Sequence, residues 1–128
     1  MIVGTGVDIV EIDRMAGILE RHGERFCSRV FTPTEIEYCR SSAHPAESFA
    51  ARFAAKEAAL KALGVGWQRG TRFTDVHVSN DDLGAPHIEL HGRAREISRE
   101  LGVQKMHITI SHDHNYAVAQ VIAEGDAS

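Results

Sequence analysis

The 128-residue sequence predicts a single domain of the α+β class, spanning residues 1–128. Two observations predict this class. Two pairs of segments with alternating apolar and polar residues occur at residues 73–91 and 106–121, and each pair flanks a short turn. Helical segments with capping signals precede and separate these pairs, and such a mixture of hairpins and helices is typical of α+β domains.

The chain begins with a predicted strand and a predicted helix. Residues 2–12 are rich in Ile and Val, and the glycines among them allow another backbone or a ligand to approach closely. Asp13 is a candidate cap for a helix that ends near residue 22, with Gly23 as its stop signal. A further helical turn or two is expected at residues 25–30.

Two more helices are expected before the first hairpin. Residues 32–35 read Thr-Pro-Thr-Glu, a capping box with Pro at the first helical position, so a short helix should run to about residue 40. Pro45 should begin a long helix and Gly64 should end it. The loop at residues 64–71 contains three glycines, and its place directly after a charged helix favours ligand binding.

The C-terminal half is predicted to contain two hairpins and one helix. The first hairpin occupies residues 73–91, with its turn at residues 80–84. A helix is expected at residues 92–101, where Gly102 stops it. The second hairpin occupies residues 106–121, and the turn His-Asp-His-Asn joins its strands.

Composition excludes several classes of protein. The apolar fraction of 43% is sufficient for one core, and the net charge of −4 argues against a nucleic-acid partner. No segment approaches the roughly 20 apolar residues that a membrane span needs. The N-terminus has neither a basic region nor a cleavage site for export, and two cysteines do not make a disulfide framework, so we expect a cytoplasmic protein.

The long helix carries charges where a plain amphipathic helix would not need them. At 100° per residue, four residues form an apolar stripe: Phe49, Phe53, Leu60 and Leu63. Lys56 falls inside this stripe and Glu57 at its edge. Because a charge on a buried stripe is costly without a partner, both residues are candidates for a specific role.

Glu57 could belong to a metal site together with Asp8. Glu57 and Lys61 are four residues apart, which is compatible with a simple surface ion pair. Alternatively, a carboxylate and an ammonium beside a glycine-rich loop would suit a divalent cation next to a phosphate. Asp8 is either a residue of a strand-end turn or a second oxygen ligand, since Mg²⁺ typically takes one or two carboxylates and completes its shell with water and phosphates.

The second hairpin carries Ser111, His112 and His114. A nucleophilic Ser–His pair is disfavoured, because adjacent residues of a strand point to opposite faces. A zinc site is also disfavoured, because no third ligand has matching spacing. The favoured interpretation is that the hairpin presents Ser111 and His112 as hydrogen-bond donors to a phosphate.

The first helical region has a basic character, from Arg14, Arg21, Arg25 and Arg29. Three acidic residues, Asp13, Glu20 and Glu24, partly offset it. These arginines are either a solvated helix face or a docking surface for an acidic partner.

Three motifs in order resemble the holo-acyl-carrier-protein synthases, the small bacterial type of 4′-phosphopantetheinyl transferase. Residues 4–8 match the G-x-G-x-D opening of this family, and residues 53–61 match its (W/F)-x-x-K-E-(A/S)-x-x-K signature in full. Residues 108–119 resemble its closing hairpin, and residues 31–35 fit the intervening segment. The resemblance runs nearly from end to end.

This resemblance implies a fold, a reaction and an assembly. The fold is that of the 4′-phosphopantetheinyl transferases, an antiparallel sheet with a long helix packed on it. The reaction moves the phosphopantetheine arm of coenzyme A to a serine of apo acyl carrier protein and releases adenosine 3′,5′-bisphosphate, in fatty acid biosynthesis. The resemblance also implies Mg²⁺, for which Mn²⁺ could substitute, and a homotrimer with active sites between subunits.

It further implies roles for single residues. Asp8 and Glu57 would hold the metal, and the catalytic residues would be Glu57, Lys61 and His112. Six residues would bind the coenzyme: Arg52, Lys56, Lys61, Gly64, Ser111 and His112. Three arginines would face the acidic carrier protein: Arg14, Arg21 and Arg25. The base that removes the serine proton is left open between Glu57, a metal-bound water and His112.

Two other functions are compatible with parts of the sequence. One is a non-catalytic subunit that binds a nucleotide or coenzyme A, although the presence of both acidic and both lysine positions argues against it. The other is a metal-dependent hydrolase that uses Ser111 and His112, which the strand geometry disfavours.

Overall fold

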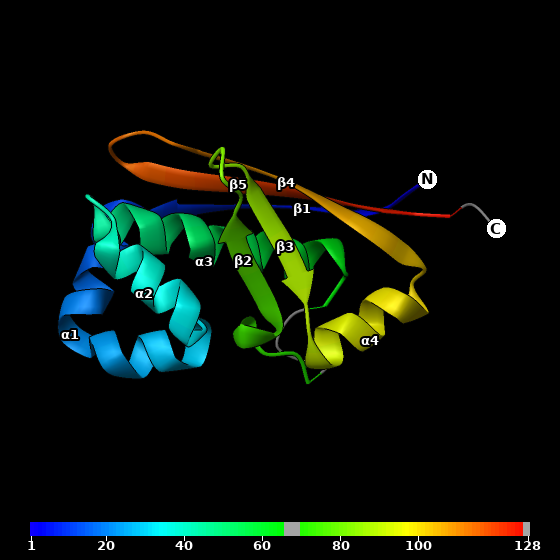
Figure 1. The fold of residues 1–128 in the computed structure, drawn as a ribbon, viewed down its shortest axis with the longest axis horizontal. Helices are drawn as coiled ribbons and strands as arrows, with labels where there is room; N and C mark the ends of the chain where they lie inside the picture. Colours follow the sequence, from blue (N-terminus) through cyan, green and yellow to red (C-terminus); the bar gives the residue numbers. More distant parts are fainter. Residues whose placement is uncertain (66–69, 127–128) are drawn as a thin grey trace.

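A three-stranded antiparallel sheet and the helix α3 that packs across it organise the fold. The protein is described here from a computed structural model, which describes residues 1–65 and 70–126. The strands of the sheet lie in the order β1-β5-β4: Ile2–Glu11, Tyr116–Gly125 and Val103–His112. Helix α3, Pro45–Ala62, lies along one face of this sheet (Figure 1). The predicted α+β class and the predicted packing of the long helix on the sheet are confirmed.

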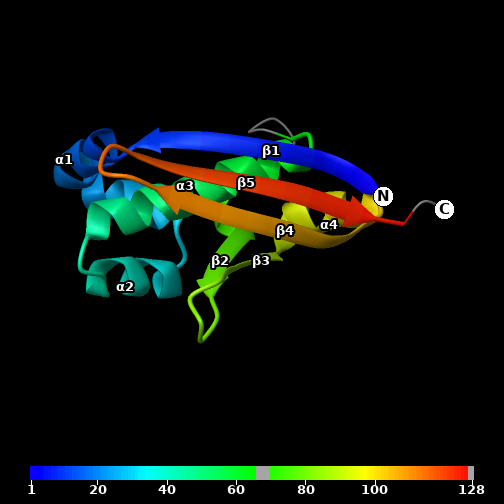
Figure 2. The same cartoon turned by 90° about the horizontal axis from the view of Figure 1, so that it is seen from above.

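The remaining elements pack around α3 and against β4. They are α1 (Ile12–Val30), α2 (Pro33–Ser41), the 3₁₀ turn η2 (Phe73–Asp75), β2 (Val76–Asn80), β3 (Pro86–Leu90) and α4 (Gly92–Glu100). Strands β2 and β3 form a separate antiparallel pair, in which β2 contacts α3 and β3 contacts β4 of the main sheet. Figure 2 shows this pair extending past the β4 edge of the sheet. Both predicted hairpins are therefore present.

Several predicted boundaries differ from the structure. The predicted break near residue 22 is present, because α1 consists of two helical stretches joined by a kink at His22, where φ is −137° and ψ is 26°, and the second stretch ends at Val30. The N-cap position is Glu11, so Asp13 lies within the first helical turn instead of capping it. The capping box at Thr32 and Glu35 is present as predicted.

Helix α3 is buried on more sides than the predicted apolar stripe. Ten of its residues are buried: Phe49, Ala50, Arg52, Ala54, Ala55, Lys56, Ala58, Ala59, Leu60 and Ala62. The alanines have small side chains, so neighbouring elements can approach the helix from both sides. The helix is therefore a central element with layers on both faces, which a single-stripe pattern does not predict. In the described part of the chain, no helix has the length and apolarity needed to cross a membrane.

Two glycines of β1 let this strand come into direct backbone contact with α3. A methyl group added at Gly4 would lie 2.0 Å from the carbonyl oxygen of Ala62, and one added at Gly6 would lie 2.0 Å from that of Ala58. No side chain fits at either position without moving the strand away from the helix. The expectation that glycines in this strand permit a close approach of another backbone is confirmed.

Replacing Gly6 with Ala should therefore destabilise the protein. The added methyl group would overlap the Ala58 carbonyl, and overpacking of this kind typically costs about 1–3 kcal/mol. Urea unfolding measures this loss. Gly23→Ala is the matched control, because nothing lies within 4 Å of its added methyl group, and it should be neutral or stabilising. Equal unfolding curves for Gly6→Ala and the parent protein would contradict the proposed close contact.

Candidate active site

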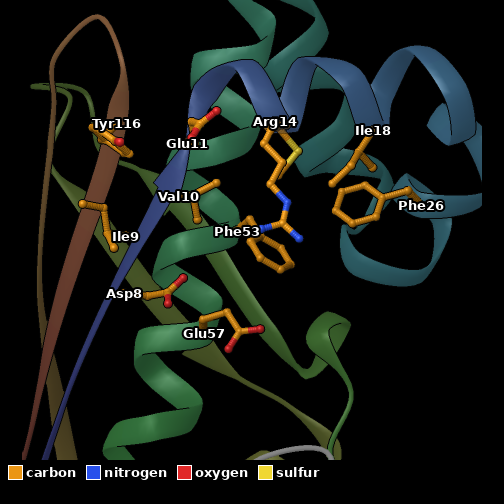
Figure 3. A pocket seen from close by; sticks show the side chains of 11 residues that line it. Asp8, Ile9, Val10, Glu11, Arg14, Ile18, Phe26, Phe53, Glu57 and Tyr116 are labelled. Carbon is orange, nitrogen blue, oxygen red and sulfur yellow. The ribbon is translucent and has the colours of Figure 1, made fainter.

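Asp8 of β1 and Glu57 of α3 line the same pocket, which has a volume of about 480 Å³ (Figure 3). Asp8 belongs to the face of β1 that packs on α3, two residues after Gly6. The close approach at Gly6 therefore brings Asp8 next to the helical turn that carries Glu57. The sequence prediction that these two distant carboxylates belong together agrees with this geometry.

The electrostatics of the pocket make Glu57 reluctant to ionise. Burial raises the pKa of Glu57 above its ordinary value, and the nearby negative charge of Asp8 raises it further, while Lys61 acts in the opposite direction. The Nζ atom of Lys61 lies 3.1 Å from Oδ1 of Asp8 and donates to the carbonyl oxygen of Val7 at 3.0 Å. About half of the Lys61 side chain is exposed, so its ammonium is also accessible to a ligand that binds at the surface.

Such a pair of carboxylates fits a hard divalent cation. Two partly desolvated carboxylates that repel each other are stabilised by a cation between them, and oxygen ligands of this kind suit Mg²⁺. Among the described residues, no group of three or more His, Cys, Asp or Glu side chains is placed to hold a metal ion. A cation held by Asp8 and Glu57 would therefore take its other ligands from water or from a substrate.

Arg14 of α1 lines the same pocket as Asp8 and Glu57 (Figure 3). The aromatic rings of Phe26 and Phe53, 5.8 Å apart, form an apolar wall beside it. All three arginines predicted to bind a partner, Arg14, Arg21 and Arg25, are exposed on α1. Arg14 thus connects this exposed basic helix with the carboxylate pair.

A second pocket brings Arg52 and His112 together. Its volume is about 280 Å³, and Asn80 of β2 also lines it. Arg52 is buried, donates to the side chain of Asn80 at 2.8 Å and stacks over the ring of Tyr38 at 3.9 Å. Among the groups that the structure describes, the buried Nε of Arg52 has no hydrogen-bond partner. His112 lies 3.3 Å from the Glu47 carboxylate.

Ser111 and His112 are the last two residues of β4, so Ser111 lies in the strand as predicted and the strand extends one residue further than predicted, to His112. Adjacent strand residues face opposite sides of the sheet, and the donation of both side chains to a phosphate stays a prediction. His112 is directed to the α3 side of the sheet, while Ser111 pairs with Val118 on the other face. This arrangement supports the earlier argument against a Ser–His nucleophile.

Within one chain, the structure does not bring His112 to the carboxylate pair. In the order β1-β5-β4, Asp8 lies on one edge strand and His112 on the other, and His112 is not among the residues that line the Asp8–Glu57 pocket. A reaction that uses both groups would need two copies of the chain.

Lys56 is not available to a ligand, so the prediction that it contacts the coenzyme is wrong. Its side chain is completely buried, and its ammonium lies 2.7 Å from Oε1 of Glu35. It also donates to the backbone carbonyls of Phe73 at 3.0 Å and Val76 at 2.6 Å. The partner is a carboxylate of the same chain and not one of a neighbouring subunit.

The glycine-rich loop is only partly described. Gly64 is exposed and adopts a φ of 71°, which explains why glycine follows the end of α3. Residues 66–69, the centre of the predicted ligand-binding loop, lie outside the described residues. The predicted contact of Gly64 with the coenzyme stays a prediction.

Glu35 is a residue of the site region that sequence reasoning missed. The capping box identified it as a helix cap, and its Oε1 accepts the Thr32 amide at 2.8 Å as such a motif requires. Its other carboxylate oxygen, Oε2, accepts the amide of Val78 at 2.8 Å. Only the apolar stripe around Lys56 indicated that a buried carboxylate was needed, and it did not indicate which one.

Comparisons with known proteins show the family to which this chain belongs. The model of the 4′-phosphopantetheinyl transferase superfamily matches residues 4–121. A holo-[acyl-carrier-protein] synthase of Koribacter versatilis is 48% identical over 124 residues, which are 97% of this chain and 99% of the relative. The chain belongs to the holo-[acyl-carrier-protein] synthase family of these transferases.

Solved structures of this family have the same fold. The enzyme from Neisseria meningitidis superposes with a TM-score of 0.87 and is 33% identical, with 97% of this chain and 99% of that one covered. The Helicobacter pylori holo-[acyl-carrier-protein] synthase, solved in complex with coenzyme A, superposes with a TM-score of 0.82 at 34% identity over 94% of this chain and 99% of that one. The α+β fold with its central helix is therefore the fold of the family.

Because Glu57 is ionised at a cost, Glu57→Gln should stabilise the metal-free protein at neutral pH. A group whose pKa is higher in the folded state stabilises the fold only while it is protonated, and this contribution is lost as the pH rises through the folded-state pKa. The stabilisation by Glu57→Gln should therefore vanish at pH values below the ordinary pKa of Glu. At such pH values Glu57 is protonated in both the folded and the unfolded parent protein.

Urea unfolding in the presence of a chelator, over a series of pH values, measures this difference. Glu37→Gln, which removes an exposed carboxylate from α2, controls for the loss of one negative charge. If Glu57→Gln and the parent differ by the same amount at acid and neutral pH, the account of the carboxylate pair is incorrect.

Proposed function

We propose that this protein transfers the 4′-phosphopantetheine arm of coenzyme A to a serine of apo acyl carrier protein and releases adenosine 3′,5′-bisphosphate. Membership of the holo-[acyl-carrier-protein] synthase family supports the reaction class. The observation that carries the proposal for this chain is the pocket that Asp8 and Glu57 line together, with the Lys61 ammonium 3.1 Å from the Asp8 carboxylate. We further propose that it acts in fatty acid biosynthesis in the cytoplasm, without a nucleic-acid or membrane partner.

Asp8 and Glu57 are the residues that would hold Mg²⁺ or Mn²⁺. A bound divalent cation supplies neutralisation of the negative charge on the coenzyme pyrophosphate and the leaving group. The chain itself contributes the orientation of the two carboxylates, since the Gly6 contact holds Asp8 against the helical turn of Glu57. Lys61 contributes an ammonium group that contacts Asp8 in this structure and that would contact a phosphate oxygen of the bound coenzyme.

Glu57 is our proposal for the group that removes the proton of the acceptor serine, directly or through a water. Its raised pKa makes it a better proton acceptor than an ordinary carboxylate when it is ionised. His112 is the rival base. Its position on the opposite edge strand means that it would act on the carboxylate pair of another copy.

The second pocket is our proposal for part of the coenzyme site. The guanidinium-bearing Arg52 and the imidazole-bearing His112 line this pocket together. Planar guanidinium groups and imidazoles suit phosphate and base recognition. Ser111 and Gly64 would make further contacts with the coenzyme from the edge of β4 and the end of α3.

A homotrimer with active sites between subunits would unite these two pockets. The residues of the carboxylate pair lie near the β1 edge of the sheet, while Ser111 and His112 lie on the β4 edge. In a closed ring of identical chains, each contact joins one surface of a subunit to a different surface of the next. The exposed apolar side chains of Val7, Ile9 and Tyr116 on the sheet are compatible with such a contact.

The exposed arginines of α1 are our proposal for the surface that binds the acidic carrier protein. Arg14 lies at the pocket, so a carrier protein bound there could present its serine to the carboxylate pair. Arg21 and Arg25 extend the basic surface along the same helix. Charges of this kind increase the rate of association and make it depend on salt.

The reaction itself can be tested by mass spectrometry. The protein is incubated with coenzyme A, Mg²⁺ and apo acyl carrier protein, and the carrier is weighed. The proposal predicts a mass increase of one phosphopantetheine group. Glu57→Gln should remain folded and lose activity by about 100-fold or more, since it can neither carry the metal charge nor accept the proton. Near-normal turnover of Glu57→Gln would overturn the role of this residue, and an unmodified carrier would favour a non-catalytic coenzyme-binding protein.

Reversal of charge at Arg14 tests the carrier surface. Arg14→Glu should raise the KM for the carrier protein, and this KM should depend less on salt than that of the parent. Arg99→Glu, which makes the same change at an exposed position of α4, is the control and should leave the KM unchanged. Steady-state kinetics at several salt concentrations measure both values. An equal KM for Arg14→Glu and Arg99→Glu would rule out the docking role.

A further inference from the structure

The buried Lys56–Glu35 pair joins four elements of the fold. The Lys56 ammonium meets three acceptors, namely the Glu35 carboxylate and the backbone carbonyls of Phe73 and Val76. These acceptors come from α2, η2 and β2, so each N–H of the ammonium is directed at a different element. The helix α3 is thereby attached to the layer on the side opposite the main sheet.

The Glu35 carboxylate is itself held from several directions. It accepts hydrogen bonds from the amides of Thr32 and Val78 in addition to the contact with Lys56. Both side chains are completely buried. A helix could be held against α2 and β2 by apolar side chains of similar volume, often at no cost in stability. Hydrogen bonds to fixed backbone groups are directional, unlike apolar packing. They are therefore satisfied in only one orientation of α3 about its axis.

The rotation of α3 decides where Glu57 points. Successive residues of a helix are about 100° apart, so the direction of Lys56 determines the direction of the adjacent Glu57. On the opposite side of the helix, the Gly6 contact with Ala58 sets the distance to β1. The helix is therefore fixed from two sides, and the Asp8–Glu57 pocket lies between a close backbone contact and a buried ion pair.

We infer that Lys56 and Glu35 are positioning residues, which set the rotation of α3 that holds Glu57 and Lys61 against Asp8. This inference deepens the proposed function and rests on it. It assigns to Lys56 a role in the alignment of the metal-binding carboxylates without any contact with the coenzyme. A rotation of α3 would change the direction of Glu57 relative to Asp8 on β1.

The test compares three variants with the parent protein. Lys56→Met removes the ammonium but leaves a buried carboxylate alone, which can unfold the protein. The double variant E35Q/K56M removes both charges, keeps an acceptor for the Val78 amide and decides the test if Lys56→Met is unfolded. Ile97→Ala is the control, because it opens a cavity at a buried position of α4, remote from the carboxylate pair.

Two readouts separate alignment from general stability. The first is the affinity of each protein for Mn²⁺ alone, followed by electron paramagnetic resonance without coenzyme or carrier. The second is kcat at saturating substrates in the mass assay. Both are measured at a temperature where thermal unfolding shows every compared protein to be folded. We expect the Mn²⁺ affinity and the kcat of E35Q/K56M to be about ten-fold to a hundred-fold lower than those of the parent. Ile97→Ala should keep the parent's Mn²⁺ affinity and kcat.

The outcomes distinguish this inference from the proposed function. Suppose that the parent binds Mn²⁺ and transfers phosphopantetheine, and that the folded E35Q/K56M does both equally well. The inference about Lys56 and Glu35 is then overturned, while the proposed function stands. If Ile97→Ala loses as much as E35Q/K56M, the effect is one of stability and the inference also fails. If the parent itself neither binds Mn²⁺ nor modifies the carrier, the proposed function fails and the inference fails with it.

Discussion

The contact between the backbones of β1 and α3 is the constraint on which the candidate site depends. Asp8 and Glu57 are far apart in the sequence and belong to different kinds of element. They line one pocket because Gly6 leaves room for the Ala58 carbonyl, with no side chain between strand and helix. The small residues of the strand and the helix therefore serve the chemistry as directly as the carboxylates do.

The same closeness creates the electrostatic character of the pocket. Burial raises the pKa of Glu57, and the nearby negative charge of Asp8 raises this pKa further. Lys61 offsets part of this increase through its contact with Asp8. A site of this kind is unfavourable when it is unfilled and becomes favourable when a divalent cation and an anionic substrate bind together. The burial of α3 by the elements packed around it offsets the unfavourable free energy of the unfilled carboxylate pair.

Much of this arrangement could be predicted from the sequence, because it depends on local signals. The capping box at Thr32, the glycines of β1 and the spacing of Glu57 and Lys61 are readable within a few residues. The partner of Lys56 could not be predicted, because Glu35 lies 21 positions earlier in the chain and its capping role already explained it. Asp8 and His112 lie on opposite edges of the sheet because the strand order is β1-β5-β4. The alternation of residues along each strand does not determine this order, so the separation of the two residues could not be predicted.

We propose that Asp8 and Glu57 together bind the cation that contacts the coenzyme. The most direct measurement is a crystal structure of the protein grown with coenzyme A and Mn²⁺, in which anomalous scattering locates the metal. The account predicts a metal peak between the carboxylates of Asp8 and Glu57, with the coenzyme pyrophosphate as a further ligand. A metal peak away from these two carboxylates, or a coenzyme pyrophosphate far from both of them, would contradict it.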